Sequence, residues 1–491
     1  MSGELDRRRF LQWTFAGTLL GGCPVFADTF PDRLVIGGES LSVGHMLRDG
    51  HEFPEPTVRT RHDVVIVGGG LAGLTSAYLL RGEDVLLLEK EPQWGGNARL
   101  EERYDRSFAI GSAFLHEDDE AARLARELGL RPMPIEDWDG TVLAGRFIPN
   151  TWRDGLNELP YRRSVRAKFK ALREDALSWK LEDEAGKLDQ VALIEVLGPY
   201  GQEVLQWWHT YCPSNWGGRA DRIAASVAIE ELRWMAGDDE SDGRATWPGG
   251  IGALSSHLAE RLTPVMGERM IREATVIRVV PQNDRVEVTY VRDGVVTAVS
   301  AKTVIMATPQ YISSRVLSEV PDDQLAAMRR LRYAPYAVVN LVFDRPVYDK
   351  TYDTWCPGAR FCDVIVADWV ERRHGAALDR HQVLTCYAPL LEEERRQLLT
   401  ADGCRKLAQK VVVDFQGLLP QTRVEPIEVR IYRRGHAFHI AQPGLGPVQW
   451  RASTPIGRVS FANADSQNLV SSAAGAVNAA RRAVREIEGF L

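Results

Sequence analysis

The sequence lacks the features of nucleic-acid-binding, metal-binding and membrane-spanning proteins. Its net charge is -7, so it offers no basic surface for nucleic acid. Beyond the N-terminus, no uncharged apolar run reaches the ~18 residues that suggest a membrane span. The 6 cysteines are not spaced as zinc ligands, and neither a P-loop nor a Ser-His-Asp arrangement is present. What remains is a chain of 491 residues, 44% apolar and 26% charged, with length for about two or three domains.

The N-terminus has the pattern of an export signal. The run from Asp6 to Leu11 contains Arg7 and Arg8 and resembles the twin-arginine motif R-R-x-F-L, and a moderately apolar stretch follows. We therefore expect residues 1–27 to direct export to the periplasm. Either signal peptidase cleaves before Asp28, or a lipobox ending at Cys23 makes the protein a membrane-tethered lipoprotein. An amphipathic N-terminal helix is the remaining alternative.

The segment after this signal carries few structural cues. Residues 28–61 are rich in glycine, proline and charge, which predicts an extended connector.

Two cysteines later in the chain, Cys356 and Cys362, are close enough in sequence for a small disulfide in an oxidising compartment. Buried free thiols are the expected state of most of the cysteines.

One stretch near residue 70 indicates dinucleotide binding. An apolar strand from Asp63 ends at Gly68, and Gly68, Gly70 and Gly73 match G-x-G-x-x-G. This spacing permits a tight turn, close approach of a pyrophosphate and close packing of the following helix, whose N-terminus attracts phosphate. A second strand then ends in Glu89, about 20 residues on, where a carboxylate accepts ribose hydroxyls.

A second glycine-containing loop follows that strand. Gly95 and Gly96 open it, and Arg99 stands where its guanidinium would meet a phosphate. Phe108 to Phe114 then has the pattern of a short strand and turn.

These two units resemble the flavin-containing amine oxidase superfamily, which includes monoamine and polyamine oxidases, protoporphyrinogen oxidase and phytoene-desaturase-like enzymes. The resemblance recurs in the family's order at four later segments: Trp247–Leu254, Ala274–Val280, Thr303–Pro309 and Gly457–Asp465. It implies an α/β fold in which a Rossmann-like FAD-binding domain of the glutathione-reductase type is interleaved with an α+β substrate domain. The FAD domain would comprise residues 62–115, 246–310 and 450–491, and the substrate domain residues 116–245 and 311–449.

The last segments of the chain, around Asp465 and Ser472, have residue types suited to binding the flavin. Asp465 follows a strand and is placed to accept hydrogen bonds from ribityl hydroxyls. Ser472 and Ala473 open a helix of small residues whose N-terminal dipole would stabilise negative charge on the reduced flavin. A surface helix with a small packing face is the alternative. The resemblance implies non-covalent FAD, held by Gly68, Gly70, Leu71, Ala72, Gly73, Glu89, Lys90, Gly95, Gly96, Asn97, Arg99, Gly111, Ser112, Val276, Asp465, Ser472 and Ala473.

Candidate catalytic groups are few. His436 and His439 precede the last flavin segment, at a position that approaches the flavin in family members of this shape; a polar loop at the domain junction is the alternative. His209 lies in an aromatic stretch from Val204 to Trp216 that forms either a flat apolar lining or a domain core. A core histidine is the usual outcome for such a residue.

Two departures from the family pattern bear on the reaction. Amine oxidases usually carry a lysine on the strand that aligns with Val338 to Phe343, yet no lysine occurs between Lys302 and Lys350, and Val338 or Asn340 falls there. The aromatic pair that sandwiches an amine also lacks a partner near Ser472, since residues 469–477 contain no aromatic residue. No cysteine near this segment supports a cysteinyl-flavin bond.

We therefore expect an exported FAD-dependent oxidoreductase that takes a hydride to flavin N5 from a C–N or C–C bond of a small apolar or amphipathic substrate. Oxygen or a redox partner would reoxidise the flavin. A true amine oxidase is a related alternative. A flavin-binding maturation or assembly partner of another exported protein is an alternative of a different class. A nicotinamide dehydrogenase fits the first motif but not the Gly95–Gly96 loop or Asp465.

Overall fold

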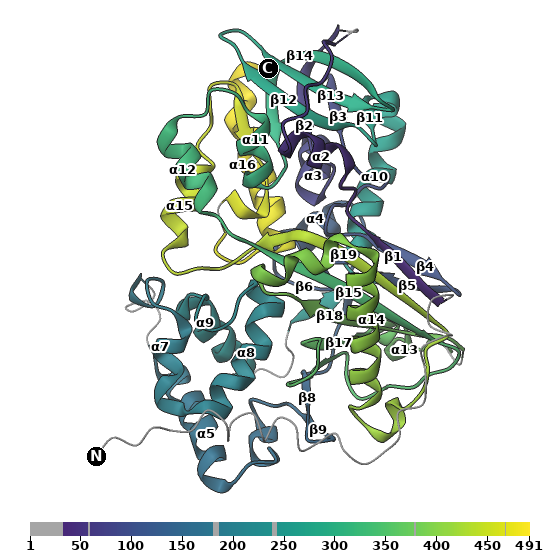
Figure 1. The fold of residues 1–491 in the computed structure, drawn as a ribbon, viewed down its shortest axis with the longest axis vertical. Helices are drawn as coiled ribbons and strands as arrows, with labels where there is room; N and C mark the ends of the chain where they lie inside the picture. Colours follow the sequence, from purple (N-terminus) through teal and green to yellow (C-terminus); the bar gives the residue numbers. More distant parts are fainter. Residues whose placement is uncertain (1–32, 57–58, 180–185, 238–242, 378–379, 467) are drawn as a thin grey trace. The chain divides into compact units, whose positions relative to one another are not determined.

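Two mixed sheets organise the computed structural model (Figure 1), which describes residues 33–56, 59–179, 186–237, 243–377, 380–466 and 468–491. Residues 35–491 form one compact unit. The twin-arginine segment and Cys23 lie outside the described residues.

The first sheet has seven strands in the order β11-β3-β2-β14-β13-β12, with β20 also paired to β14. Residues 64–67 and 85–88 of its parallel centre are all buried, so these strands are apolar on both faces. The strands are β2 (Arg59–Val67), β3 (Val85–Leu88), β11 (Met270–Ile271), β12 (Thr275–Pro281), β13 (Val286–Arg292), β14 (Val295–Met306) and β20 (Val459–Phe461).

One face of this sheet shares a buried apolar cluster with four helices, among which α16 packs on both α3 and α4. Figure 1 shows α3 and α16 beside the strands of this sheet, although the end of the chain forms α16. The helices are α3 (Leu71–Leu79), α4 (Glu120–Glu127), α10 (Gly252–Met266) and α16 (Ala473–Ile487).

The second sheet has eight strands in the order β1-β19-β15-β18-β17-β16-β8-β9. Every residue of its central strand β15 is buried, so this strand is covered on both faces. The strands are β1 (Leu34–Gly38), β8 (Gly140–Leu143), β9 (Arg146–Pro149), β15 (Tyr333–Phe343), β16 (Asp353–Trp355), β17 (Asp363–Val366), β18 (Gln382–Pro389) and β19 (Glu428–His439).

A helical layer adjoins the second sheet, where the aromatic stretch of the sequence forms a buried core. Trp207, Trp208 and Trp216 pack there with Trp152 and Trp355. The helices are α5 (Arg163–Ser178), α7 (Leu193–Leu197), α8 (Gln202–Trp216) and α9 (Ala225–Ala236). Other elements are α11 (Gln310–Val316), α12 (Asp322–Arg330), α13 (Trp369–Arg373), α14 (Ala401–Gln416), α15 (Leu445–Ala452) and the small strands β6 (Leu115–His116), β7 (Met133–Pro134) and β10 (Arg244–Thr246).

The expected fold class is confirmed, since strands of both sheets alternate along the chain with helices. The residue limits of the two domains stay a prediction. The prediction of an extended connector at 28–61 was wrong, because this segment contains β1, helix α2 (Ser42–Arg48) and the start of β2. A strand as short as β1 is stabilised by its pairing with β19, more than 390 residues away, and nothing local encodes that partner.

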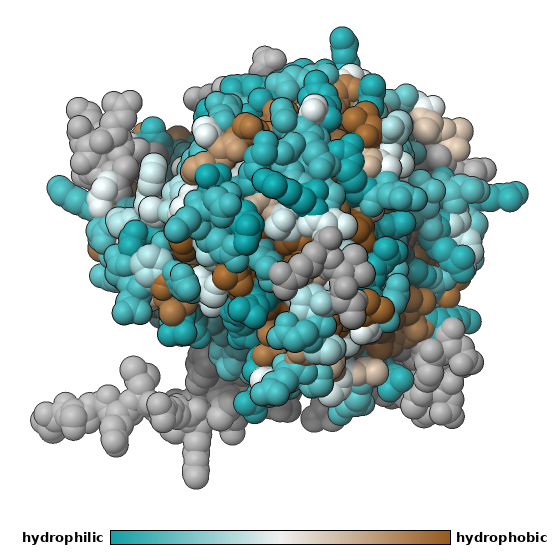
Figure 2. All heavy atoms as spheres, turned by 90° about the horizontal axis from the view of Figure 1, so that it is seen from above, coloured by the Kyte–Doolittle hydropathy of each residue, from teal (hydrophilic) through white to brown (hydrophobic). Residues whose placement is uncertain are grey.

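Three further observations concern the whole unit. Cys212, Cys356, Cys362, Cys386 and Cys404 are buried free thiols, so no disulfide joins Cys356 to Cys362. None of the helices in the described part of the chain has the length and apolar character needed to span a membrane. On the face shown in Figure 2, hydrophilic residues predominate and apolar residues gather only in small groups.

Candidate cofactor site and its neighbourhood

The glycine turn after β2 leaves no room for side chains. Helix α3 begins at Leu71 with Gly70 as its N-cap, so the first N–H groups of the helix, those of Leu71, Ala72 and Gly73, have no partner within the helix. A Cβ at Gly73 would lie 1.8 Å from the carbonyl oxygen of Gly68. The helix can therefore approach the strand this closely only with glycine at position 73, as the motif predicts.

The second glycine loop lies directly against the first. The N–H of Gly95 donates to the carbonyl oxygen of Gly69 at 2.8 Å, and Gly70 and Gly95 form an isolated bridge. A Cβ at Gly96 would lie 3.0 Å from the Cα of Gly70. The two loops thus present bare backbone to each other at the start of α3, where a phosphate group is favoured.

Glu89 braces this turn. Its carboxylate accepts hydrogen bonds from the N–H groups of Gly69 (2.6 Å) and Glu91 (2.8 Å), and burial raises its pKa. Lys90 points away and bonds the carboxylate of Glu91. Ala274, two residues before Val276, donates its N–H to the carbonyl oxygen of Glu89 at 2.8 Å. The residues predicted for the ribose and adenine therefore lie at one end of β3.

Two buried arginines flank the second loop. Arg99 is 7% exposed and Arg434, on β19, is 8% exposed. Arg434 donates from Nη2 to the carbonyl oxygen of Gly96 at 2.6 Å, while the Nε atoms of both arginines have no hydrogen-bond partner among the described residues. Neither makes an ion pair within 4.0 Å in that part of the chain. Two buried guanidinium groups beside a helix N-terminus suit the pyrophosphate of a dinucleotide.

Asn97, Gly111 and Ser112 are brought together at the edge of this site. The carbonyl oxygen of Asn97 accepts the N–H of Ser112 at 3.0 Å, and its side-chain amide donates to the carbonyl oxygen of Ala437 on β19. A Cβ at Gly111 would lie 1.9 Å from the Asn97 carbonyl oxygen. This loop therefore joins the first sheet to β19.

The closing segment adds a buried carboxylate. Asp465 is 1% exposed and accepts hydrogen bonds from the Tyr333 hydroxyl (2.5 Å) and the Gln310 N–H (2.8 Å). Burial raises its pKa to about 6, against the effect of these bonds. Its Oδ1 atom has no partner in the described part of the chain, so it is free to accept a ligand hydroxyl. Ser472 caps the following helix α16, with its hydroxyl 3.0 Å from the Gly475 N–H, and Ala473 is the first helical residue.

Two of the three candidate histidines, His436 and His439, lie on β19 beside Tyr333. His439 pairs with Tyr333 across the sheet, and the ring centroid of His436 is 6.3 Å from that of Tyr333, where the register of β19 against β15 shifts. His436 stacks on Tyr311 with ring centroids 4.5 Å apart, and burial, then Arg395 and Arg315, lower its pKa to about 4. His209, on α8, accepts the Ala220 N–H at 3.2 Å, and burial lowers its pKa. Position 436 is thus part of a strand, not of a polar loop.

His439 has the geometry of a bracing residue. It is 2% exposed, and its Nε2 lies 2.9 Å from the carbonyl oxygen of Leu469, so the neutral ring donates a hydrogen bond to the segment that precedes α16. Burial lowers its pKa to about 4. A neutral ring whose N–H is bonded to a backbone carbonyl oxygen is poorly suited to proton transfer. The neighbouring Gln449 side chain donates to the carbonyl oxygens of Asp465 and Asn468.

This histidine should make stability depend on pH. A folded pKa of about 4 lies below that of an unfolded histidine, so its contribution is complete above about pH 6.5 and is lost as pH falls toward 4. Between pH 7.5 and 5.0 the loss should be about 2 kcal/mol. In urea unfolding, His439→Gln should therefore fall furthest behind the wild type at pH 7.5, and the gap should narrow by that amount at pH 5.0. An equal gap at both pH values would contradict a buried neutral ring.

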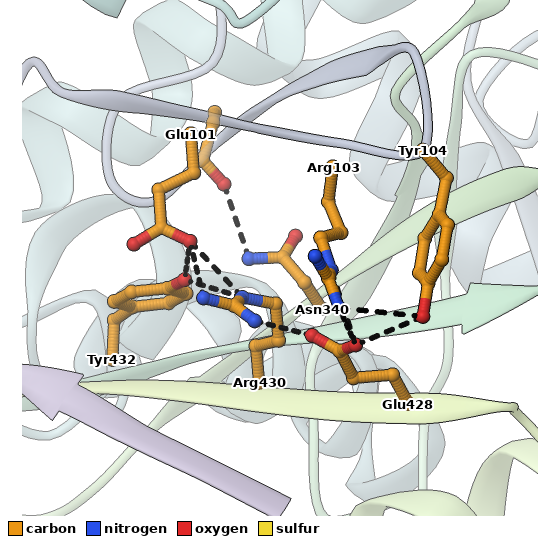
Figure 3. A network of polar contacts seen from close by, with 8 residues as sticks. Glu101, Arg103, Tyr104, Asn340, Glu428, Arg430 and Tyr432 are labelled. Carbon is orange, nitrogen blue, oxygen red and sulfur yellow. Dashed lines mark hydrogen bonds and ion pairs between the residues drawn. The ribbon is translucent and has the colours of Figure 1, made fainter. Parts of the chain in front are cut away.

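Asn340 occupies the region where the family resemblance places a lysine. It is fully buried, accepts a hydrogen bond from the Thr385 hydroxyl (2.7 Å) and donates to the carbonyl oxygen of Ala109 (3.3 Å). Figure 3 shows it beside a polar network that joins the hairpin of β4 (Leu100–Arg103) and β5 (Arg106–Ala109) to β19. The members of that network are Glu101, Arg103, Tyr104, Glu428, Arg430 and Tyr432.

A small cavity lies next to Asn340's partners. Ala109, Ala113 and Gly250 line it from the side of the predicted flavin segments, and Ala367 and Ile365 from the second sheet. Its polar groups are the hydroxyls of Thr246, Tyr352, Thr385 and Tyr387, and no charged side chain is among the described residues that line it. Burial raises the pKa of both tyrosines. The cavity is therefore suited to an uncharged group.

Several polar residues of this region have no sequence signal. Arg434, Asp353 and Asp363 are nearly completely buried, and Ser214 links Asp363 (2.5 Å) to the Tyr336 hydroxyl (2.7 Å). Burial raises the pKa of Asp363 to about 8. Their partners lie about 100 residues or more away in sequence, so only the fold reveals them.

Comparison with known proteins agrees with this geometry. The family model described as flavin containing amine oxidoreductase matches residues 71–488. Among curated proteins, the chain is 22% identical over 519 residues to the oxidoreductase PigB of Serratia sp. (strain ATCC 39006), covering 88% of this chain and 76% of that one. It is also 22% identical over 475 residues to mouse (Mus musculus) flavin-containing amine oxidase B, covering 87% and 86%.

Solved structures show the same fold at low identity. A putrescine oxidase bound to putrescine superposes with a TM-score of 0.67 at 19% identity, covering 88% of this chain and 100% of the other. Cyclohexylamine oxidase from Brevibacterium oxydans IH-35A superposes with a TM-score of 0.66 at 17% identity, covering 87% and 98%.

Proposed function

The chain belongs to the flavin containing amine oxidoreductase family and is an FAD-dependent oxidoreductase, and from that premise we propose its reaction. It takes a hydride from a C–N or C–C bond of a small apolar or amphipathic substrate. Bound FAD supplies the acceptor, N5 of the flavin. Oxygen or a redox partner then removes the electrons.

The uncharged cavity beside Ala109 and Ala113 carries this proposal. The Thr385 hydroxyl donates to the Asn340 side-chain oxygen and the Tyr387 hydroxyl donates to the Gly111 carbonyl oxygen, each at 2.7 Å. Their oxygens can therefore orient a polar end of a substrate by accepting a hydrogen bond from it. Because no carboxylate lines the cavity among the described residues, a charged ammonium would be bound there without a counter-charge. The cavity thus favours an uncharged group of a substrate over a charged one.

The FAD itself would be held by the groups already described. The backbone of the two glycine loops, the α3 N-terminus and Arg99 would bind the pyrophosphate. The free Oδ1 of Asp465 would accept a ribityl hydroxyl, and the N-terminus of α16 would stabilise negative charge on the flavin pyrimidine ring.

Oxidation of a true amine is the alternative, and the names of the relatives support it: the mouse protein is an amine oxidase and two structural neighbours are named for putrescine and cyclohexylamine. Against it stands Asn340, whose neutral amide bonds Thr385 and Ala109 and does not supply the ammonium group of a lysine.

Anaerobic reduction of the flavin tests the reaction. The purified protein should be yellow, with an absorbance maximum at about 450 nm. Under anaerobic conditions, apolar or amphipathic hydride donors from a panel of amines, polyenes and amino acids should bleach this flavin absorbance. Ala367→Leu, which narrows the cavity, should keep the absorbance and slow bleaching about tenfold. Ala376→Leu, at an exposed position, is the matched control. Bleaching by none of the panel, or only by small polyamines, would overturn the proposal and, in the first case, favour a maturation partner.

Export to the periplasm is also part of the proposal and rests on the arginine pair at Arg7 and Arg8. In a bacterial host, replacing both by lysine should retain the flavoprotein in the cytoplasm. The mature N-terminus would then distinguish cleavage before Asp28 from an acylated Cys23, and an uncleaved cytoplasmic wild type would contradict export.

A further inference from the structure

Arg434 is an unusual residue for the interior of a sheet. Its neighbour Arg433 is only half-buried and donates to the carbonyl oxygen of Leu398 at 2.7 Å. Arg434 points to the other face of β19, is 8% exposed, and its Nη2 reaches the carbonyl oxygen of Gly96 at 2.6 Å. Arg434, on a strand of the second sheet, thus places its guanidinium group against the Gly95–Gly96 loop, which follows β3 of the first sheet.

The charge of Arg434 is not balanced by a direct partner. Burial, and then the nearby Arg99, lower its pKa to about 10, while Glu39, Glu91 and Glu89 act in the opposite direction from further away. Within the described residues it has no ion pair closer than 4.0 Å, and its Nε is buried without a hydrogen-bond partner. Since a buried, unpaired charge is costly, this arrangement is expected where an anion completes the site.

The position of this cation identifies the anion. The Gly95–Gly96 loop contacts Gly70, the N-cap of α3, so the site is bounded by two arginines, bare loop backbone and a helix N-terminus. A pyrophosphate has two negative charges, which match the two guanidinium groups. Resting on the family assignment and the proposed function, we propose that Arg434 binds the FAD pyrophosphate from the second sheet, opposite Arg99.

The residues around Arg434 fix it in this position. The Glu39 carboxylate accepts the N–H of Gly435 at 3.1 Å, and the N–H of Ser40 donates to the Glu91 carboxylate at 3.0 Å. The segment after β1 therefore holds the backbone next to Arg434 on one side and the strand-end loop of the first sheet on the other. FAD bound between Arg99 and Arg434 would be a further tie between the two sheets.

Ligand binding to the full-length apoprotein tests this role without measuring turnover. Dissociation constants for FAD, ADP and adenosine are compared in the wild type, Arg434→Met and Arg433→Met. Loss of a charged hydrogen bond should weaken FAD and ADP binding about 10- to 100-fold in Arg434→Met. Adenosine, which has no phosphate, should bind all three proteins within about twofold, and Arg433→Met should resemble the wild type. Arg434→Lys should recover part of the lost FAD and ADP affinity, because lysine keeps the positive charge but lacks the planar, bidentate guanidinium group.

Two outcomes would overturn the proposal. One is unchanged ADP affinity in Arg434→Met; the other is an equal loss for ADP and adenosine, which would indicate a general distortion of the site. If Arg434→Met does not fold, Arg434→Lys decides by the same ADP-to-adenosine comparison: an unchanged ratio contradicts a pyrophosphate contact. Failure of the wild type to bind FAD would instead refute the function, so the two failures are distinguishable.

Discussion

Replacing Gly73 by alanine should give a protein that is purified without flavin. The added Cβ would lie 1.8 Å from the carbonyl oxygen of Gly68, and backbone cannot yield as a flexible side chain does. The helix must move away from β2, and its N-terminus then no longer meets the phosphate at the Gly95–Gly96 loop. We expect at least about a hundredfold weaker FAD binding, measured by flavin content and by titration of apoprotein.

Gly82→Ala is the matched control for this change. Gly82 follows α3 in a turn, and a Cβ there would meet no atom within 4 Å. This variant should keep full flavin content and the melting temperature of the wild type. A Gly73→Ala protein with stoichiometric FAD would contradict the placement of the cofactor at this turn.

Replacing Arg244 by methionine should cause the largest loss of stability among single changes at buried charges. Arg244 is 2% exposed, pairs with Asp139, and has Nη1 at 3.8 Å from the carboxylate of Asp353. Burial raises the pKa of Asp353 well above its usual range, and Arg244 opposes this shift. Removing one partner of a buried pair costs about 3–5 kcal/mol. For a chain of this length, that corresponds to a melting temperature lower by about 3–5 °C.

Two comparisons isolate the cause of that loss. Arg244→Met combined with Asp139→Asn should regain part of the stability, because the amide oxygen can still accept the Trp355 indole N–H at 2.9 Å without an unpaired charge. Arg269→Met, which breaks a half-exposed pair with Asp84 at 3.2 Å, should cost less than about 1 kcal/mol. The loss in Arg244→Met should also shrink at low pH, where the carboxylates are protonated. Equal losses for Arg244→Met and Arg269→Met would contradict the buried network.

Local patterns predicted those parts of the molecule that local physics determines. The strand, glycine turn and helix at residues 63–79 have their spacing fixed by contacts within the same 20 residues, such as that of Gly73 with Gly68. The buried strand at 336–343 is likewise evident from an apolar run that only Asn340 interrupts. The serine cap of α16 follows from the residue type alone.

Other parts depend on partners that the sequence does not reveal. The pattern Arg433-Arg434-Gly435-His436 suggests an exposed polar loop, yet it is a strand, because β15 on one side and β1 on the other pair with it. Burial of Arg434 follows from its contact with Gly96, 338 residues away. The roles of His436 and His439 as acid or base stay predictions, although the bond of His439 to Leu469 favours a structural role.

The strand order has a consequence for synthesis of the protein. In the first sheet, β2 lies between β3 and β14, and β14 also pairs with β20 at 459–461; in the second, β1 lies beside β19 at 428–439. Neither sheet can close until nearly all of the chain has left the ribosome, and such distant pairings form slowly. The nascent chain will therefore expose unpaired strands for most of translation.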